Sequence, residues 1–190
     1  MSVAGVVLAA GGSRRLGRPK QLVEVDGETL VRRALGRVLA CGCDPVGLVV
    51  GADAERIAAT ILDLGIVVLR NDEWQEGIAS SIRVAAAWAE AIVCDGLLLA
   101  LCDQVHLTEV QLRSLLAAFA RETRCVGSAY SGTIGAPAVF ALSDLSALGE
   151  LKGDRGAGRL LAGAPSVEWP QGAIDIDTDE DVSAHLRGRV

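Results

Sequence analysis

Short apolar runs alternate along the chain with segments in which apolar residues return every three or four positions. The continuous runs are typical of strands buried on both faces, and they cover residues 3–8, 45–50, 66–69 and 97–101. The periodic segments are typical of helices with one buried face, and they cover residues 29–40, 53–62, 78–91 and a segment after Thr108. Strands that alternate with helices predict an α/β fold in three layers, a Rossmann-like, mostly parallel sheet with helices on both faces.

The pattern is less regular in the last third of the chain. Residues 125–130 read as a strand, but Pro137 interrupts the next apolar run, which favours an edge strand or a loop there. Residues 151–161 are charged and rich in glycine, and they predict a loop before a helix. Thr178 is placed to cap the last helix.

The first predicted strand leads into Gly11 and Gly12, and four cations follow within residues 14–20. Glycines allow a turn whose N–H groups face an anion, so this loop is a candidate phosphate site. It is not a P-loop, because Arg18 and Pro19 follow Gly17 where that motif requires a lysine and a hydroxyl. It is also not a dinucleotide fingerprint, because no helix opens directly after the glycines. The alternative is a solvated turn that binds nothing.

Composition narrows the choice of partners. The 190 residues are enough for one α/β domain, which we expect to span residues 1–190. A net charge of −6 argues against a nucleic-acid partner. No apolar run approaches the roughly 18 residues that span a bilayer, and the start shows no signal-peptide pattern. We therefore expect a cytoplasmic protein without membrane contact.

Acidic residues supply candidate metal ligands at two places. Asp103 follows the apolar strand 97–101, where a carboxylate can hold magnesium or can simply cap a helix. Near the other end, acids at 179–181 are explained by the positive first turn of a helix. Asp175 and Asp177 precede that turn, lie on one face of an extended segment, and are left over as candidate ligands.

Residues 8–20 resemble the signature Leu-Ala-Ala-Gly-x-Ser-x-Arg-[Met/Leu]-Gly-x-x-Lys of the MobA-like nucleotidyltransferases. The likeness is closest to the molybdenum cofactor cytidylyltransferases, whose loop continues Pro-Lys-Gln-Leu, as residues 19–22 do. The resemblance implies catalytic roles for Arg15, rather than Arg14, and for Lys20. It also implies nucleotide contacts from Leu8, Ala9, Ala10, Gly11, Gly12 and Lys20.

Four further stretches resemble elements of the same family. Leu101 to Gln104 is similar to its Leu-Cys-Asp-Gln element, which implies that Asp103 binds the nucleotide and Mg²⁺ and is catalytic. Residues 175–181 are similar to the family's ending Asp-x-Asp-Thr-Pro-Glu-Asp, except that Asp179 replaces proline. The resemblance implies that Asp177 is the second metal ligand and Asp175 the reserve. Residues 74–83 resemble the stretch associated with the base, which implies contacts from Gly77, Ser80 and Ser81. In the loop at 154–159, Gly158 stands where the family has an arginine, and Arg159 comes one position later.

The resemblance implies transfer of CMP from CTP to the phosphate of molybdenum-bearing molybdopterin, with release of pyrophosphate. It also implies transient contact with the molybdoenzyme that receives the product. Ala10 favours cytosine, because the guanylyl branch has glycine at this position. Two other functions stay open. One is transfer to another phosphate, such as a sugar phosphate or methylerythritol phosphate, and the other is a non-enzymatic, nucleotide-binding chaperone for cofactor insertion.

Overall fold

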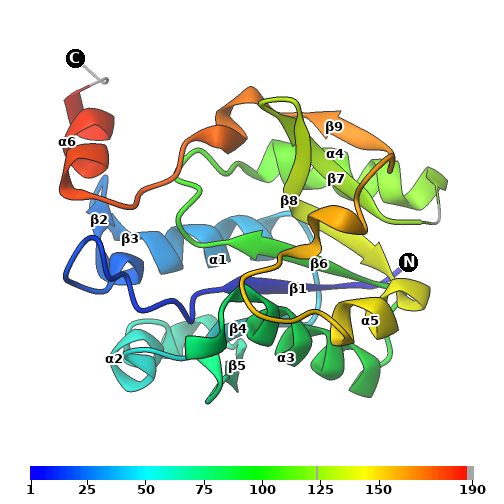
Figure 1. Ribbon diagram of the computed structural model, residues 1–190, viewed down its shortest axis with the longest axis horizontal. Helices are drawn as coiled ribbons and strands as arrows, with labels where there is room; N and C mark the ends of the chain where they lie inside the picture. The colour runs from blue at the N-terminus through cyan, green and yellow to red at the C-terminus, as the bar shows by residue number, and fades with distance from the viewer. Residues whose placement is uncertain (123, 188–190) are drawn as a thin grey trace.

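The computed structural model describes residues 1–122 and 124–187, and within them a seven-stranded sheet runs between layers of helices (Figure 1). The strand order is β5-β4-β1-β6-β8-β7-β9. Two short strands, β2 (Glu24–Val25) and β3 (Glu28–Thr29), form a separate hairpin. The strands of the main sheet are β1 (Val3–Leu8), β4 (Val46–Val50), β5 (Val67–Arg70), β6 (Gly96–Leu101), β7 (Val126–Tyr130), β8 (Thr133–Ala141) and β9 (Ser166–Glu168).

The predicted fold class is confirmed. Strands β5, β4, β1 and β6 pair in parallel, β8 runs antiparallel to both of its neighbours, and β9 is parallel to β7. Five helices lie between strands of the chain: α1 (Leu30–Ala40), α2 (Ala54–Ala59), α3 (Ile78–Ala91), α4 (Glu109–Glu122) and α5 (Leu142–Gly149); α6 (Asp179–Arg187) follows the last strand of the described residues. In the described residues, none of these helices is both long and apolar enough to span a membrane.

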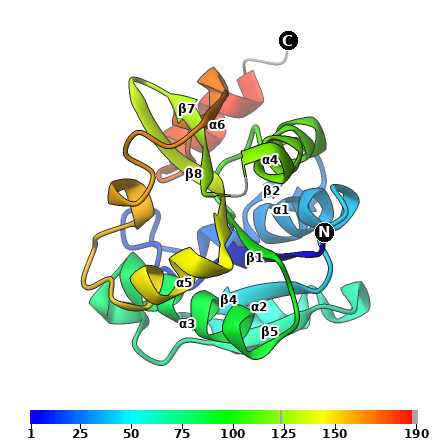
Figure 2. The ribbon, with the colours of Figure 1, turned by 90° about the vertical axis from the view of Figure 1, so that its right-hand side faces the viewer.

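Both faces of the sheet are buried, which explains the continuous apolar strands. Along β1, Val3 and Val7 belong to the core beneath α1 and α4, whereas Val6 and Leu8 belong to the core beneath α3 and α5. The alternation follows from the two-residue period of a strand. Figure 2 shows the two helical layers on either side of β1.

The structure differs from the sequence prediction at residues 134–140, which form neither an edge strand nor a loop. They belong to β8, an internal strand between β6 and β7. The pairing of β7 with β8 passes from Gly127 opposite Ala138 to Ser128 opposite Gly135, so Pro137 falls in a register shift. A proline is tolerated there because no ladder hydrogen bond requires its missing N–H.

The helix termini differ in how they are capped. Thr29, the first residue of the predicted helix 29–40, precedes α1; its side chain makes no capping hydrogen bond and its buried Oγ1 has no partner among the described residues. No helix follows residues 151–161 as predicted: this segment contains the short 3-10 turn Ala157–Arg159, and the next element is the strand β9. Thr178 caps α6 as predicted, because its Oγ1 accepts a hydrogen bond of 3.2 Å from the N–H of Asp181.

Candidate active site

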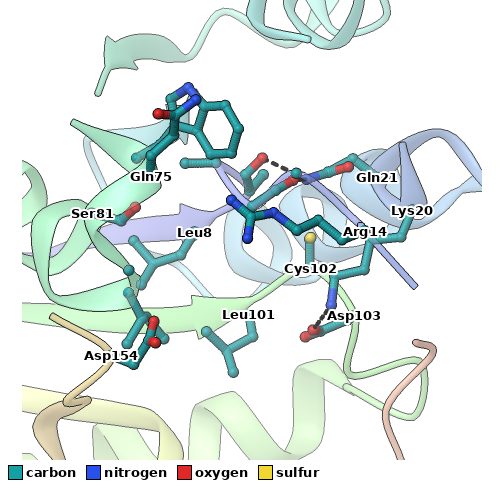
Figure 3. A pocket seen from close by; sticks show the side chains of 17 residues that line it. Leu8, Arg14, Lys20, Gln21, Gln75, Ser81, Leu101, Cys102, Asp103 and Asp154 are labelled. Atoms are coloured by element: carbon teal, nitrogen blue, oxygen red, sulfur yellow. Dashed lines mark hydrogen bonds and ion pairs between the residues drawn. The ribbon is translucent and has the colours of Figure 1, made fainter. Parts of the chain in front are cut away.

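The glycine loop after β1 and Asp103 after β6 meet at the carboxyl edge of the sheet, where they border a cavity of about 350 Å³ (Figure 3). This follows from the parallel pairing of β1 with β6, which brings the two strand ends together. The cavity is lined by Leu8, Ala9, Ala10, Gly11, Gly12, Arg14, Lys20, Gln21, Trp74, Gln75, Gly77, Ile78, Ser81, Leu101, Cys102, Asp103 and Asp154. Most of the predicted nucleotide contacts are in this set.

The buried side chain of Gln21 holds the loop in shape, a role that the sequence analysis did not assign. Its amide Nε2 donates to the carbonyls of Ala9 and Gly11, both at 2.8 Å. Ser13 reinforces the loop, because its Oγ accepts a hydrogen bond of 2.9 Å from the N–H of Lys20. An amide that bonds two loop carbonyls fixes the backbone without using a charged group.

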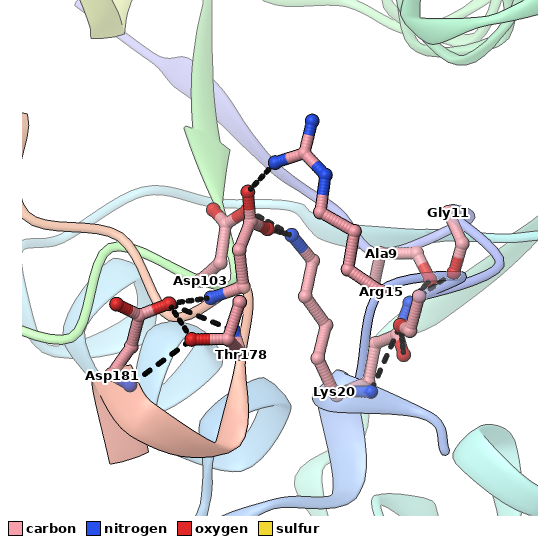
Figure 4. A network of polar contacts seen from close by, with 10 residues as sticks. Ala9, Gly11, Arg15, Lys20, Asp103, Thr178 and Asp181 are labelled. Atoms are coloured by element: carbon pink, nitrogen blue, oxygen red, sulfur yellow. Dashed lines mark hydrogen bonds and ion pairs between the residues drawn. The ribbon is translucent and has the colours of Figure 1, made fainter. Parts of the chain in front are cut away.

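Lys20 joins the two predicted metal ligands (Figure 4). Its Nζ lies 2.5 Å from Oδ2 of Asp103 and 2.8 Å from Oδ1 of Asp177. Burial by itself lowers the pKa of Lys20, but the negative charge and hydrogen bond of Asp103, together with Asp177, raise that pKa above its ordinary value. The ammonium is therefore charged, and it lies between two carboxylates that are 157 and 83 residues away along the chain.

The donor set suits a hard divalent cation. Oδ1 of Asp103 is buried and has no hydrogen-bond partner in the described part of the chain, so one acceptor oxygen is left for another ligand. Magnesium prefers oxygen ligands and usually takes only one or two carboxylates, with substrate phosphates as further ligands. Within the described residues, no three side chains of the types Asp, Glu, His and Cys converge on a common point. Asp103 and Asp177 are thus the residues that could hold the ion together with a nucleotide.

The four cations of the loop have different environments. Arg15 lies outside the cavity lining, and its guanidinium contacts Asp177 at 3.0 Å. Arg18 contacts Asp179 at 2.6 Å. Arg14, which the sequence analysis passed over in favour of Arg15, extends along the cavity between Lys20 and Gln75 in Figure 3, and it makes no hydrogen bond or ion pair with any described residue. What distinguishes Arg15 from its neighbour Arg14 is the position of Asp177, which lies far along the chain.

Asp175, the reserve metal ligand, is brought near the pair but not into it. The lysine bonds Asp177 and not Asp175. Although Asp175 is exposed by its overall surface, partial desolvation of its carboxyl and the nearby charge of Asp103 raise its pKa to about 6. Lys20 thus joins Asp103 to Asp177, and Asp175 lies outside this ion pair.

Gly77 makes room for another loop of the protein. A side chain at this position would collide with Oδ1 of Asp154 and with the carbonyl of Gly153, and its φ of 126° disfavours other residues. The same loop accepts a hydrogen bond of 3.1 Å from the N–H of Ala79 to Gly153. The sequence analysis explained this glycine by close approach of a base, whereas the close approach that the structure contains is that of residues 153 and 154.

The two serines at the start of α3, Ser80 and Ser81, have different environments. Ser81 lines the cavity. Ser80 does not, because its hydroxyl donates to the carbonyl of Gly77 at 2.8 Å and accepts from Nδ2 of Asn71 at 2.8 Å. Ser80 is thus engaged in the turn before the helix, and of the two only Ser81 borders the space where a base would lie.

Comparison with known proteins agrees with this arrangement. The family model of the MobA-like NTP transferase domain matches residues 5–169. The nicotine blue oxidoreductase of Paenarthrobacter nicotinovorans is 38% identical over 130 residues, which cover 68% of this chain and 62% of that protein. The molybdenum cofactor guanylyltransferase of Rhodobacter capsulatus is 28% identical, over 96% of this chain and 94% of its own.

A solved structure matches over nearly the full length. Rv0371c of Mycobacterium tuberculosis H37Rv, crystallised in complex with manganese, has a TM-score of 0.80 and 26% identity, over 98% of this chain and 99% of its own. The loop, the acidic strand end and the family match over most of the chain lead to one conclusion: this chain belongs to the MobA-like NTP transferase family.

Proposed function

We propose that this nucleotidyltransferase transfers CMP from CTP to the phosphate of molybdenum-bearing molybdopterin and releases pyrophosphate. One observation carries the proposal: the glycine loop, Arg14 and Asp103 border one cavity, and among the described residues Arg14 has no ion-pair partner and the buried Oδ1 of Asp103 has no hydrogen-bond partner. The name of the Rhodobacter relative supports the acceptor. That relative is called a guanylyltransferase, so the base rests on the sequence resemblance and on Ala10.

In this reaction an oxygen of the acceptor phosphate forms a bond to the α-phosphorus of CTP, and the bond to the β-phosphate oxygen breaks. Lys20 and Arg15 balance the charge that develops on the α-phosphate and on pyrophosphate. The loop from Leu8 to Gly12 faces the nucleotide, and Ser81 and Gly77 border the base. The acceptor phosphate is already ionised, so the step needs no general base.

Asp103 and Asp177 would hold Mg²⁺, which neutralises phosphate charge and aligns the reacting groups. In the structure both carboxylates bond Lys20. We propose that Lys20 turns from these carboxylates toward the phosphates when nucleotide and metal bind. The manganese complex of Rv0371c supports a divalent ion in this fold.

The proposal also covers the domain organisation, the location and the partners of the protein. We propose that residues 1–190 act as a single domain in the cytoplasm, without nucleic acid or membrane contact. The recipient molybdoenzyme is the expected transient partner.

Pyrophosphate release tests the function. The purified protein is incubated with Mg²⁺, molybdenum-bearing molybdopterin and either CTP, GTP, UTP or ATP, and pyrophosphate is measured. We expect release with CTP that depends on both the acceptor and the metal. Nucleotide binding without release under all conditions would favour a chaperone, and release with a sugar phosphate or methylerythritol phosphate as acceptor would favour the other transferase.

The nicotine blue oxidoreductase gives a second candidate, oxidation or reduction of a compound such as nicotine blue, because its identity of 38% is high for so long a match. The glycine loop argues against it, since the spacing of a dinucleotide fingerprint is missing. Oxidation of NADH or NADPH in the presence of such a compound is the measurement that decides. We expect none.

A further inference from the structure

Asp154 is a second carboxylate beside the nucleotide cavity, and the proposed function gives it no role. Among the described residues that line this cavity, the acids are Asp103 and Asp154. Asp103 is paired with Lys20, whereas the carboxylate of Asp154 makes no hydrogen bond or ion pair with any described residue. Figure 3 shows Asp154 on the side of the cavity opposite Lys20 and Asp103. An unpaired carboxylate in this position is available to a ligand.

Backbone contacts hold the loop that carries Asp154 against the segment before α3. The N–H of Gly153 donates to Oε1 of Glu76 at 2.8 Å, and the carbonyl of Gly153 accepts from the N–H of Ala79 at 3.1 Å. Gly77 leaves room for Oδ1 of Asp154, which a Cβ at that position would overlap. The side chain of Asp154 takes part in neither hydrogen bond. The loop therefore places the carboxylate at the cavity, and replacing this side chain leaves both hydrogen bonds in place.

Charge separates a phosphate side of the cavity from a base side. Lys20 is on the side of Asp103, where the phosphates and the metal are expected. The carboxylate of Asp154 repels phosphate, so the uncharged base is the part of a nucleotide that can lie beside it. Ser81 and Gln75 also line the cavity away from Lys20 in Figure 3, and they supply further polar groups.

We propose that Asp154 selects the base of the nucleotide: its carboxylate accepts a hydrogen bond from an exocyclic amino group. That this base is cytosine rests on the proposed function. An ionised carboxylate only accepts hydrogen bonds, and acidic side chains accept in this way from the 4-amino group of cytosine. Uracil has a carbonyl oxygen at position 4, which would face the carboxylate as a second acceptor. The site therefore takes cytosine and rejects uracil.

Binding of CTP and UTP to the full-length protein tests this assignment without turnover. Each nucleotide is titrated with Mg²⁺ in a calorimeter, and the ratio of the two dissociation constants is the readout. A change in the attraction for the triphosphate affects both nucleotides equally, so it cancels in the ratio. We expect the unmodified protein to bind CTP about tenfold or more tightly than UTP. Equal binding of the two nucleotides would overturn the proposal.

Two variants of Asp154 separate the hydrogen bond from the charge. Asp154→Asn replaces the carboxylate by an amide, whose NH₂ can donate to the 4-carbonyl of uracil. We expect this variant to lower the preference for CTP by about tenfold or more, with tighter binding of UTP. Asp154→Ala should weaken the preference without a specific gain for UTP. Melting temperatures check that both variants are folded.

Glu150→Gln is the matched control, because it removes the same charge close to the same loop. Glu150 is exposed, lies outside the cavity lining, and has no ion pair with any described residue. Its variant should keep the ratio of the unmodified protein. An unchanged ratio in Asp154→Asn, or an equal change in Glu150→Gln, would overturn the role of Asp154. A loss of CTP and UTP affinity by the same factor would also overturn it, because that result assigns the carboxylate to the ribose that both nucleotides share.

Turnover separates this inference from the proposed function. In the transferase assay, the ratio of kcat/KM for CTP over UTP should fall in Asp154→Asn and stay unchanged in Glu150→Gln. If pyrophosphate is released with CTP but this ratio is the same in Asp154→Asn, the inference fails while the transferase function stands. If no acceptor yields pyrophosphate but the binding ratio falls in Asp154→Asn, the transferase proposal fails and the role of Asp154 stands.

Discussion

Nζ of Lys20 lies 2.5 Å from Oδ2 of Asp103, with both side chains less than a fifth exposed. The side chain expected to neutralise the phosphates thus neutralises a metal ligand in the protein alone. A divalent cation and the ammonium have the same charge preference, so both can occupy the space between the two carboxylates in turn. This pairing is the basis of the first two predictions.

Replacing Asp103 by Asn should abolish most of the turnover and keep the fold. The amide has the same shape but no charge for the metal, and we expect kcat to fall by about two orders of magnitude or more. Turnover at saturating CTP and Mg²⁺ is the measurement, with circular dichroism as the check on folding. Near-normal, magnesium-dependent rates in the folded variant would remove Asp103 from the metal site.

Replacing Lys20 or Arg15 by Ala should lower kcat by about two to three orders of magnitude, the range observed when one donor to a developing negative charge is removed. Arg18→Ala is the matched control, because Arg18 lies in the same loop and pairs with Asp179 outside the cavity lining. Steady-state kinetics on all three variants gives the comparison. An equal loss in Arg18→Ala would mean that the loop needs its ion pairs for folding rather than for chemistry.

Replacing Arg14 by Ala should raise the KM for the nucleotide about tenfold and change kcat little. Arg14 lines the cavity without a partner, so it can bind the triphosphate in the ground state, and losing roughly 1.4 kcal/mol of binding is a tenfold effect. Arg14→Lys should recover part of the affinity. A KM equal to that of the unmodified protein would show that Arg14 stays in solvent.

CTP should be used at least tens of times more efficiently than GTP. A site that hydrogen-bonds particular ring positions leaves buried groups unpaired when the wrong base enters, at roughly 1–3 kcal/mol each. The ratio of kcat/KM with the same molybdenum-loaded acceptor measures this preference. A preference for GTP would place the protein with the guanylyltransferases and would leave the loop and metal assignments unchanged.

Glu76 gives a prediction for stability against pH. Its carboxylate bonds Arg83 and the N–H of Gly153, and these contacts, Arg83 first, lower its pKa to about 2 from 4.5. A lowered pKa means that this contribution is fully present above pH 4.5 and is lost as the pH falls through about 2. Melting temperatures of the protein and of Glu76→Gln should therefore differ at pH 6 and converge near pH 2. Because the carboxylate is exposed, the difference should be small and should shrink in high salt.

Much of the site can be predicted from the sequence, because each of its main parts is a short segment that directly follows a recognisable strand. The glycine loop and Asp103 each end an apolar strand, and parallel strands bring their carboxyl ends together. Side-chain direction does not follow from such a pattern. Arg14 and Arg15 are neighbours of the same type, and only the position of Asp177 decides which of them is already paired.

The failures in the fold have the same origin. Pro137 argues against an internal strand on its own, but the register shift of β7 against β8 lies on another segment and removes the objection. Likewise, the spacing of Ser80 and Gly77 predicts contacts with a base, and it does not reveal that within the protein these residues also contact Asn71 and the loop at 153–154. A single segment of sequence does not carry the identity of such distant partners.

The ion pairs of the loop can form only late in the synthesis of the chain. Lys20 leaves the ribosome early, whereas Asp177 follows 157 residues later, and domains fold from the amino-terminal side as they emerge. Until then the nascent loop exposes a group of cations without their carboxylate partners, and it attracts any polyanion nearby. The loop therefore reaches its ion-paired form only when residues 177–179 have been made, and a chain halted before them carries a basic loop whose cations lack these carboxylates.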